Sequence, residues 1–168
     1  MIIIQSRNLD PGQHLVVLFG VGLIGGSIRT HLVSSGRFSQ KHMPFTWQPG
    51  NTQLLHKEEI IRTLGSAVKR YIQSRNNSPG VTFVWSAGSG DFFSSNSKTD
   101  IENTNFSVVL DIVRKLRADF PAVQLDYYFI SSAGALYEGQ RYVDRESIET
   151  PMCPYGTMKL NPLLSQLN

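Results

Sequence analysis

The sequence predicts an α/β protein with a doubly wound parallel sheet, and three observations lead to this fold class. Short apolar runs rich in β-branched residues recur along the chain, as at 15–19 and 81–85. Such continuous runs are typical of strands buried on both faces. Segments long enough for helices separate the runs, which favours right-handed βαβ units. The best-defined runs end in loops of small residues, and ligands bind at the carboxyl ends of strands in such sheets.

The expected strands and helices alternate along the chain. Strands are predicted at 15–19, 43–47, 81–85 and 123–130. Helices are predicted at 27–35, 54–72 and 100–116, and a last helix begins near Pro154. The segment at 54–72 is the best-defined helix, because its apolar residues recur at the 3.6-residue spacing of an amphipathic helix. The stretch from 136 to 152 is expected to be a loop.

The first loop has the spacing Gly20-x-Gly22-x-x-Gly25, directly after the strand at 15–19. In a dinucleotide-binding turn, the first glycine permits the bend and the second lets backbone approach a pyrophosphate. The third lets the helix pack on the strand, and the N–H groups of that helix face the anion. The loop therefore predicts a Rossmann-like cofactor site, with a purely structural turn as the alternative. The expected cofactor contacts come from Gly20, Gly22, Leu23, Ile24 and Gly25.

The choice between NAD and NADP stays open. An acidic residue about 20 residues beyond the glycines normally binds the ribose 2′-hydroxyl of NAD. Residues 47–51 contain no Asp or Glu, which removes the usual repulsion of a 2′-phosphate and leans toward NADP. No Arg or Lys stands there to bind that phosphate.

Tyr155 and Lys159 lie four residues apart, so they share one face of the predicted last helix. An unperturbed tyrosine has a pKa of about 10, and a neighbouring ammonium lowers that pKa because it favours the phenolate. Such a pair can move a proton to or from a carbinol while a cofactor carries the hydride. Ser132, at the end of the strand at 123–130, could hydrogen-bond a substrate oxygen. The alternatives are a chance Tyr-x-x-x-Lys spacing and a serine in a polar turn.

These segments together resemble the NAD(P)-dependent epimerase/dehydratase family, within the extended short-chain dehydrogenase/reductase superfamily. That family pairs a strand ending in Ser-Ser with a helix that begins Pro-Tyr-Gly, and this chain has ISSAGALY at 130–137 and PYGTMK at 154–159. The resemblance implies a Rossmann fold, bound NAD or NADP, and an oxidoreductase that modifies nucleotide sugars by hydride transfer. The catalytic residues that it implies are Ser132, Tyr155, Lys159 and Asn105. The further cofactor-binding residues that it implies are Ser86, Ala87, Gly88 and Ser131, together with Tyr155 and Lys159.

Three features depart from the family pattern. The family writes its first loop as G-x-x-G-x-x-G, and Phe19 stands where the first glycine belongs. The loop GVGLIGGS also resembles prephenate dehydrogenases, which are an alternative enzyme class. A long helix is predicted where the family has a short strand with an acidic residue. The chain ends nine residues after Lys159, so residues 1–168 are expected to form one NAD(P)-binding domain without the C-terminal substrate-binding part.

Composition limits the remaining classes of function. The chain has 168 residues, enough for one domain, with 40% hydrophobic and 17% charged residues, as in ordinary globular proteins. Its net charge of +3 comes from scattered Lys and Arg, so no nucleic-acid partner is expected. The single cysteine, and the absence of a signal peptide and of a long apolar run, predict a cytoplasmic protein without membrane contact. The four histidines lack ligand spacing, so no metal is expected.

Two functions of different class follow from the sequence. The first is an NAD(P)-dependent oxidoreductase, epimerase or dehydratase with Tyr155 as its acid/base. The second is a non-catalytic or inactive truncated module that only binds a nucleotide. A truncated sheet leaves an edge uncovered and favours pairing, so a homodimer is expected in either case.

Overall fold

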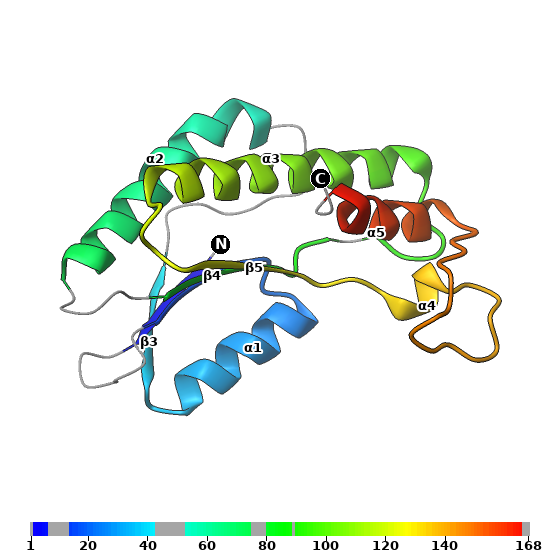
Figure 1. The fold of residues 1–168 in the computed structure, drawn as a ribbon, viewed down its shortest axis with the longest axis horizontal. Coiled ribbons are helices and arrows are strands. Elements are labelled where there is room, and N and C mark those ends of the chain that lie inside the picture. The colour runs from blue at the N-terminus through cyan, green and yellow to red at the C-terminus, as the bar shows by residue number, and fades with distance from the viewer. Residues whose placement is uncertain (1, 7–13, 43–52, 75–79, 89, 166–168) are drawn as a thin grey trace.

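A computed structural model of the chain describes residues 2–6, 14–42, 53–74, 80–88 and 90–165. Within these residues, helices cover both faces of a mixed, five-stranded sheet (Figure 1). The strands are β1 (Ile2–Ser6), β2 (His14–Phe19), β3 (Phe38–His42), β4 (Gly80–Trp85) and β5 (Leu125–Phe129). The helices are α1 (Leu23–Ser34), α2 (Gln53–Gln73), α3 (Asn96–Asp119), α4 (Ala133–Leu136) and α5 (Pro154–Ser165). The α/β class is confirmed.

The strand order is β3-β1-β2-β4-β5. β2, β4 and β5 run parallel, but β1 is antiparallel to both of its neighbours, β2 and β3. The prediction of a wholly parallel sheet is therefore wrong. Only seven residues, 7–13, separate β1 from β2, and a parallel pair needs a connection of about a dozen or more. The antiparallel arrangement follows from that short connection.

β1 also changes which strand lies beside β2. No strand was predicted at its position, and β1 takes the place next to β2 while β3 lies one strand further out. The strand predicted at 43–47 lies outside the described residues. The described strand in this part of the chain, β3, ends at His42 opposite Ile2 of β1.

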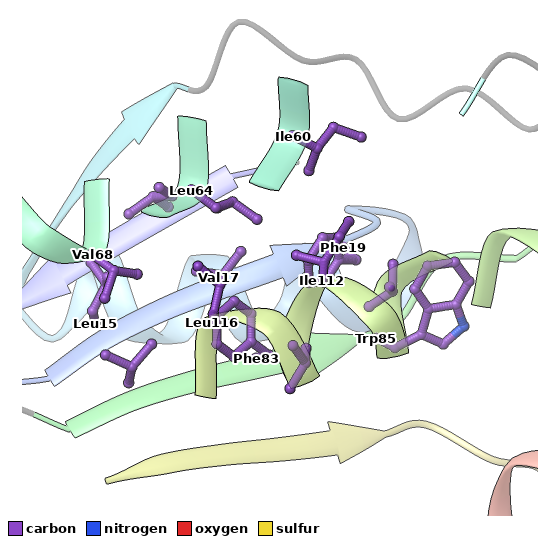
Figure 2. Packing of buried hydrophobic residues seen from close by; sticks show 14 of the residues in the cluster. Leu15, Val17, Phe19, Ile60, Leu64, Val68, Phe83, Trp85, Ile112 and Leu116 are labelled. Atoms are coloured by element: carbon purple, nitrogen blue, oxygen red, sulfur yellow. The ribbon is translucent and has the colours of Figure 1, made fainter. Parts of the chain in front are cut away.

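Two hydrophobic cores lie on opposite faces of the sheet. The larger fills the space between the sheet and helices α2 and α3, as Figure 2 shows. It takes alternate residues of β2 and β4, namely Leu15, Val17, Phe19, Val81, Phe83 and Trp85. The smaller core contains Val16, Leu18 and Val84, against Ile28 and Leu32 of α1. Because side chains alternate along a strand, β2 and β4 are buried on both faces, as their continuous apolar sequence predicts.

The helices agree with their sequence patterns, apart from their ends. α2 and α3 confirm the predicted helices at 54–72 and 100–116, and α5 begins at Pro154 as expected. α1 begins at Leu23, four residues before the predicted start. Gly25 and Gly26 lie in its first turn, and glycine has low helix propensity, which explains the late prediction. No described helix combines the length and apolar character needed to cross a membrane.

Candidate functional site

The carboxyl ends of β2 and β4 form a switch point in the sheet. These two strands are parallel neighbours, with Phe19 opposite Trp85 at their ends. From β2 the chain passes to α1 on one face, and from β4 it passes to α3 on the other (Figure 1). A crevice forms where connections diverge in this way. A cavity of about 390 Å³ lies there, and Gly20, Gly22, Ser86, Ala87, Gly88, Lys98, Glu102 and Asn105 contribute to its lining.

The glycine turn has the geometry expected of its first and third glycines. Gly20 has φ +93°, and a Cβ atom there would lie 2.5 Å from the backbone of Ala87. A Cβ atom on Gly25 would overlap the carbonyl oxygen of Gly20 and lie 2.5 Å from Ser86 Oγ. Gly22 differs, because a Cβ atom there would meet nothing within 4 Å. The turn is thus tightly packed behind Gly20 and Gly25, and open at Gly22.

Ser86 fastens the loop after β4 to the glycine turn. Its N–H donates to the carbonyl oxygen of Phe19 at 2.8 Å. Its hydroxyl donates to the carbonyl oxygen of Gly20 at 2.8 Å. Both the turn and the predicted cofactor loop at 86–88 therefore form one wall of the cavity.

A second cavity, of about 140 Å³, adjoins the first. It shares Ser86, Ala87, Gly88 and Glu102 with the larger cavity and extends to Ile24, Ser131, Tyr155 and Lys159. The hydroxyl oxygen of Ser131 is buried and has no hydrogen-bond partner among the described residues. An unsatisfied buried hydroxyl is costly to a fold, and the residue that carries this one lines the smaller cavity.

Tyr155 does not have the lowered pKa that the sequence predicts. The pKa of its phenol is raised above the ordinary value of 10, mainly because the side chain is partly buried. The negative charges of Glu102 and Asp91 raise this pKa further, and only the side chain of Ser132 acts in the opposite direction. The expectation that Lys159 lowers this pKa is therefore wrong. Burial of the phenol is the main reason, and the surroundings of Lys159 are a second one.

Lys159 is engaged in a buried ion pair. Its Nζ lies 3.3 Å from Oε1 of Glu102, and the two side chains are only 7% and 8% exposed. The ammonium also lies 5.3 Å from the centre of the Tyr155 ring and 5.2 Å from that of Phe129. The other oxygen of Glu102, Oε2, accepts the N–H of Gly90 at 3.1 Å. The positive charge of Lys159 is thus balanced by the negative charge of Glu102.

Sequence reasoning missed Glu102, although the sequence carries a signal for it. Glu102 is four residues before Phe106, so it continues the buried stripe of α3 through Phe106, Val109 and Val113. A carboxylate on the apolar face of a helix is rarely buried without a partner. In this part of α3 the sequence prediction rested on the family resemblance around Asn105, three residues further along the chain.

The structure brings some of the other predicted site residues together and keeps others apart. The structure brings Ser132, Tyr155 and Lys159 together. Asn105 is buried on α3 and lines the larger cavity rather than the smaller one. The side chain of Leu23 is 92% exposed and lines neither of these two cavities. Only the backbone of Leu23, at the first residue of α1, lies at the turn.

Two comparisons of the sequence with known proteins give no match. No protein-family model matches the sequence, and a search of curated proteins found no match. The geometry of the two cavities is therefore the basis for assigning a function.

Proposed function

We propose that the chain binds a nicotinamide dinucleotide, NAD(H) or NADP(H), along the carboxyl edge of the sheet and is an oxidoreductase that uses Tyr155 for proton transfer. The observation that carries this proposal is the pair of adjoining cavities. One lies against the glycine turn and the other against Tyr155, and both share the loop at 86–88. Two linked compartments at a switch point suit a ligand made of two joined nucleotides.

The larger cavity suits the phosphate-bearing part of the ligand. Gly22 offers open backbone at the N-terminus of α1, where N–H groups and the helix dipole favour an anion. Lys98, which also lines this cavity, adds a positive charge. Gly20 and Gly25 are needed to form this turn, because a side chain at either position would collide with backbone.

The smaller cavity suits the reacting end of the ligand and its substrate. A bound nicotinamide would supply the hydride. The phenol of Tyr155 would exchange a proton with the substrate oxygen, and Ser132, whose side chain lowers the pKa of that phenol, would orient the same oxygen. Ser131 has a free hydroxyl within the described residues and lines this cavity, so it can bind the nicotinamide end. The sequence resemblance alone suggests a nucleotide sugar as substrate and epimerase or dehydratase chemistry.

Titration of the protein with NADH and NADPH, followed by nicotinamide fluorescence, tests the binding step. We expect saturable binding of at least one of them. Turnover is then measured with a panel of nucleotide sugars, and Tyr155→Phe should abolish it while leaving cofactor affinity within about threefold, because only the phenol oxygen is removed. Undiminished turnover in Tyr155→Phe would remove Tyr155 from the mechanism.

A nucleotide-binding module without catalysis is the second candidate. The observation that favours it is the ion pair, since Lys159 is already held by Glu102 and does not lower the pKa of Tyr155. This candidate predicts cofactor binding of equal affinity in the wild type and Tyr155→Phe, with no turnover of any sugar in the panel.

A further inference from the structure

Glu102 connects three parts of the proposed site. It lies on α3 and lines both cavities. One carboxylate oxygen binds the ammonium of Lys159 on α5, and the other accepts the N–H of Gly90 in the loop after β4. A single buried side chain therefore fixes where Lys159 lies relative to that loop.

The loop after β4 leaves room for this carboxylate. Gly88 has φ +137°, and a Cβ atom there would overlap Oε1 of Glu102. A Cβ atom on Gly90 would lie 3.1 Å from Oε2 of Glu102 and 2.9 Å from the Tyr155 ring. Both glycines thus allow the carboxylate to approach the loop, in addition to any contact that they make with a ligand.

The charges around Tyr155 do not favour a phenolate. Tyr155 faces polar or charged groups from each neighbouring element. These groups are Glu102 of α3, Lys159 of α5, Ser132 before α4, Asp91 after β4 and Cys153 before α5. Two of them are carboxylates and one is an ammonium, so the positive charge of Lys159 is more than balanced. A phenolate at Tyr155 would gain little from Lys159 while Glu102 is in place.

We propose that Glu102 is a positioning residue that holds Lys159 beneath Tyr155 and cancels its charge, so that Tyr155 remains a neutral phenol and acts as a proton donor. Proton donation by Tyr155 rests on the proposed function, whereas the positioning of Lys159 by Glu102 does not. In the donating step the phenol O–H would break and its proton would join the oxygen of a substrate carbonyl, whose carbon would take up the hydride that a reduced nicotinamide supplies. The phenolate that is left would regain a proton from water. A site that starts with a neutral phenol favours addition of a proton to a carbonyl over its removal from an alcohol.

Tyrosinate absorbance measured against pH on the full, ligand-free chain tests this proposal. Subtracting the curve of Tyr155→Phe isolates Tyr155 from the other tyrosines. In the wild type we expect a midpoint above 10. Glu102→Gln should lower that midpoint by about one pH unit or more, because it removes a negative charge and leaves Lys159 unbalanced. Glu102→Asp, which keeps the charge, should restore most of the wild-type value.

Asp100→Asn is the matched control, since Asp100 is an exposed carboxylate on the same helix. It should leave the midpoint unchanged. A Glu102→Gln variant with native circular dichroism and an unchanged midpoint would overturn the proposal.

If Glu102→Gln does not fold, the double variant Glu102→Gln/Lys159→Met still decides, because it leaves neither partner of the pair charged. Two charges that cancel can be removed together without effect, so its midpoint should stay within about half a pH unit of the wild type. A rise of the midpoint by about one pH unit or more would show that the charge of Lys159 affects Tyr155 more strongly than the charge of Glu102 does, and would overturn the proposal. No cofactor is present in this titration, so its failure is distinct from a failure to bind NADH or NADPH.

Discussion

The two halves of the cleft are built by different means. The half beside β2 is shaped by backbone, with Gly20 and Gly25 packed where no Cβ atom fits. The half beside α5 is shaped by side chains, and its stability depends on a buried ion pair between Glu102 and Lys159. We therefore expect the stability of the first half to be sensitive to added atoms, and that of the second half to be sensitive to an unbalanced charge.

Breaking the ion pair should have the largest effect on stability. Lys159→Met removes the cation and leaves the buried carboxylate of Glu102 without the charge that balances it, which typically costs about 3–5 kcal/mol. Urea unfolding at neutral pH measures the loss. Removing both charges in Glu102→Gln/Lys159→Met should cost clearly less than Lys159→Met alone. Equal losses in the two variants would mean that the stability of this half depends on packing and not on charge.

Adding one carbon atom should be the next most damaging change, but only in the glycine half. In Gly25→Ala the new Cβ atom would collide with the carbonyl oxygen of Gly20 and crowd Ser86. We expect a loss of about 2–3 kcal/mol in the free energy of unfolding, from overpacking against backbone. Gly26→Ala is the control, because its Cβ atom would come no closer than 3.4 Å to Val21. A Gly25→Ala variant as stable as this control would contradict the packing described for the turn.

A substitution at Gly22 should weaken dinucleotide binding while leaving the stability of the turn almost unchanged. Its Cβ atom would enter open space, so Gly22→Ala should change the free energy of unfolding by less than about 1 kcal/mol. The same methyl group would stand where a pyrophosphate approaches the backbone, so affinity for the dinucleotide should fall by about tenfold. Thermal unfolding and a binding titration on the same preparation distinguish the two effects.

His14, at the opposite end of β2, should have the smallest effect and serves as a reference outside the cleft. Burial lowers its pKa below the ordinary 6.5, although the charge of Asp126 acts against this. The unfolded chain therefore binds a proton more readily than the folded one, so stability is complete above about pH 6.5 and decreases as the pH falls below it. Urea unfolding at about pH 7.5 and about pH 5.5 should show a smaller acid loss in His14→Gln than in the wild type. An equal acid loss in both would exclude His14 as its source.

How far the sequence predicts the site depends on how local each half is. Part of what Gly20 and Gly25 do is local, because Gly20 has φ +93° and Gly25 lies against the carbonyl oxygen of Gly20. Their spacing after a buried strand was therefore enough to predict the turn. The partner of Lys159 lies 57 residues away on α3, and nothing in the Tyr-x-x-x-Lys spacing indicates it. The pKa of Tyr155 was predicted with the wrong direction because the spacing shows neither the burial of the phenol, which is the main cause, nor the charge of Glu102.

The fold shows the same limit. β2 and β4 were predicted because a strand buried on both faces leaves a continuous apolar run. β1 was not, and with it the mixed character of the sheet was missed. Five residues near the start of the chain carry too little pattern to show that they pair between β2 and β3.

Calorimetric titration of the full chain with NADH and NADPH, on the wild type and on Gly22→Ala, is the sharpest test of dinucleotide binding at the glycine turn. We predict binding of one dinucleotide per chain in the wild type, about tenfold weaker binding in Gly22→Ala, and unchanged affinity in Gly26→Ala. Absence of binding heat in the wild type with both dinucleotides, up to about 1 mM, would contradict it. So would equal affinity in the wild type and Gly22→Ala.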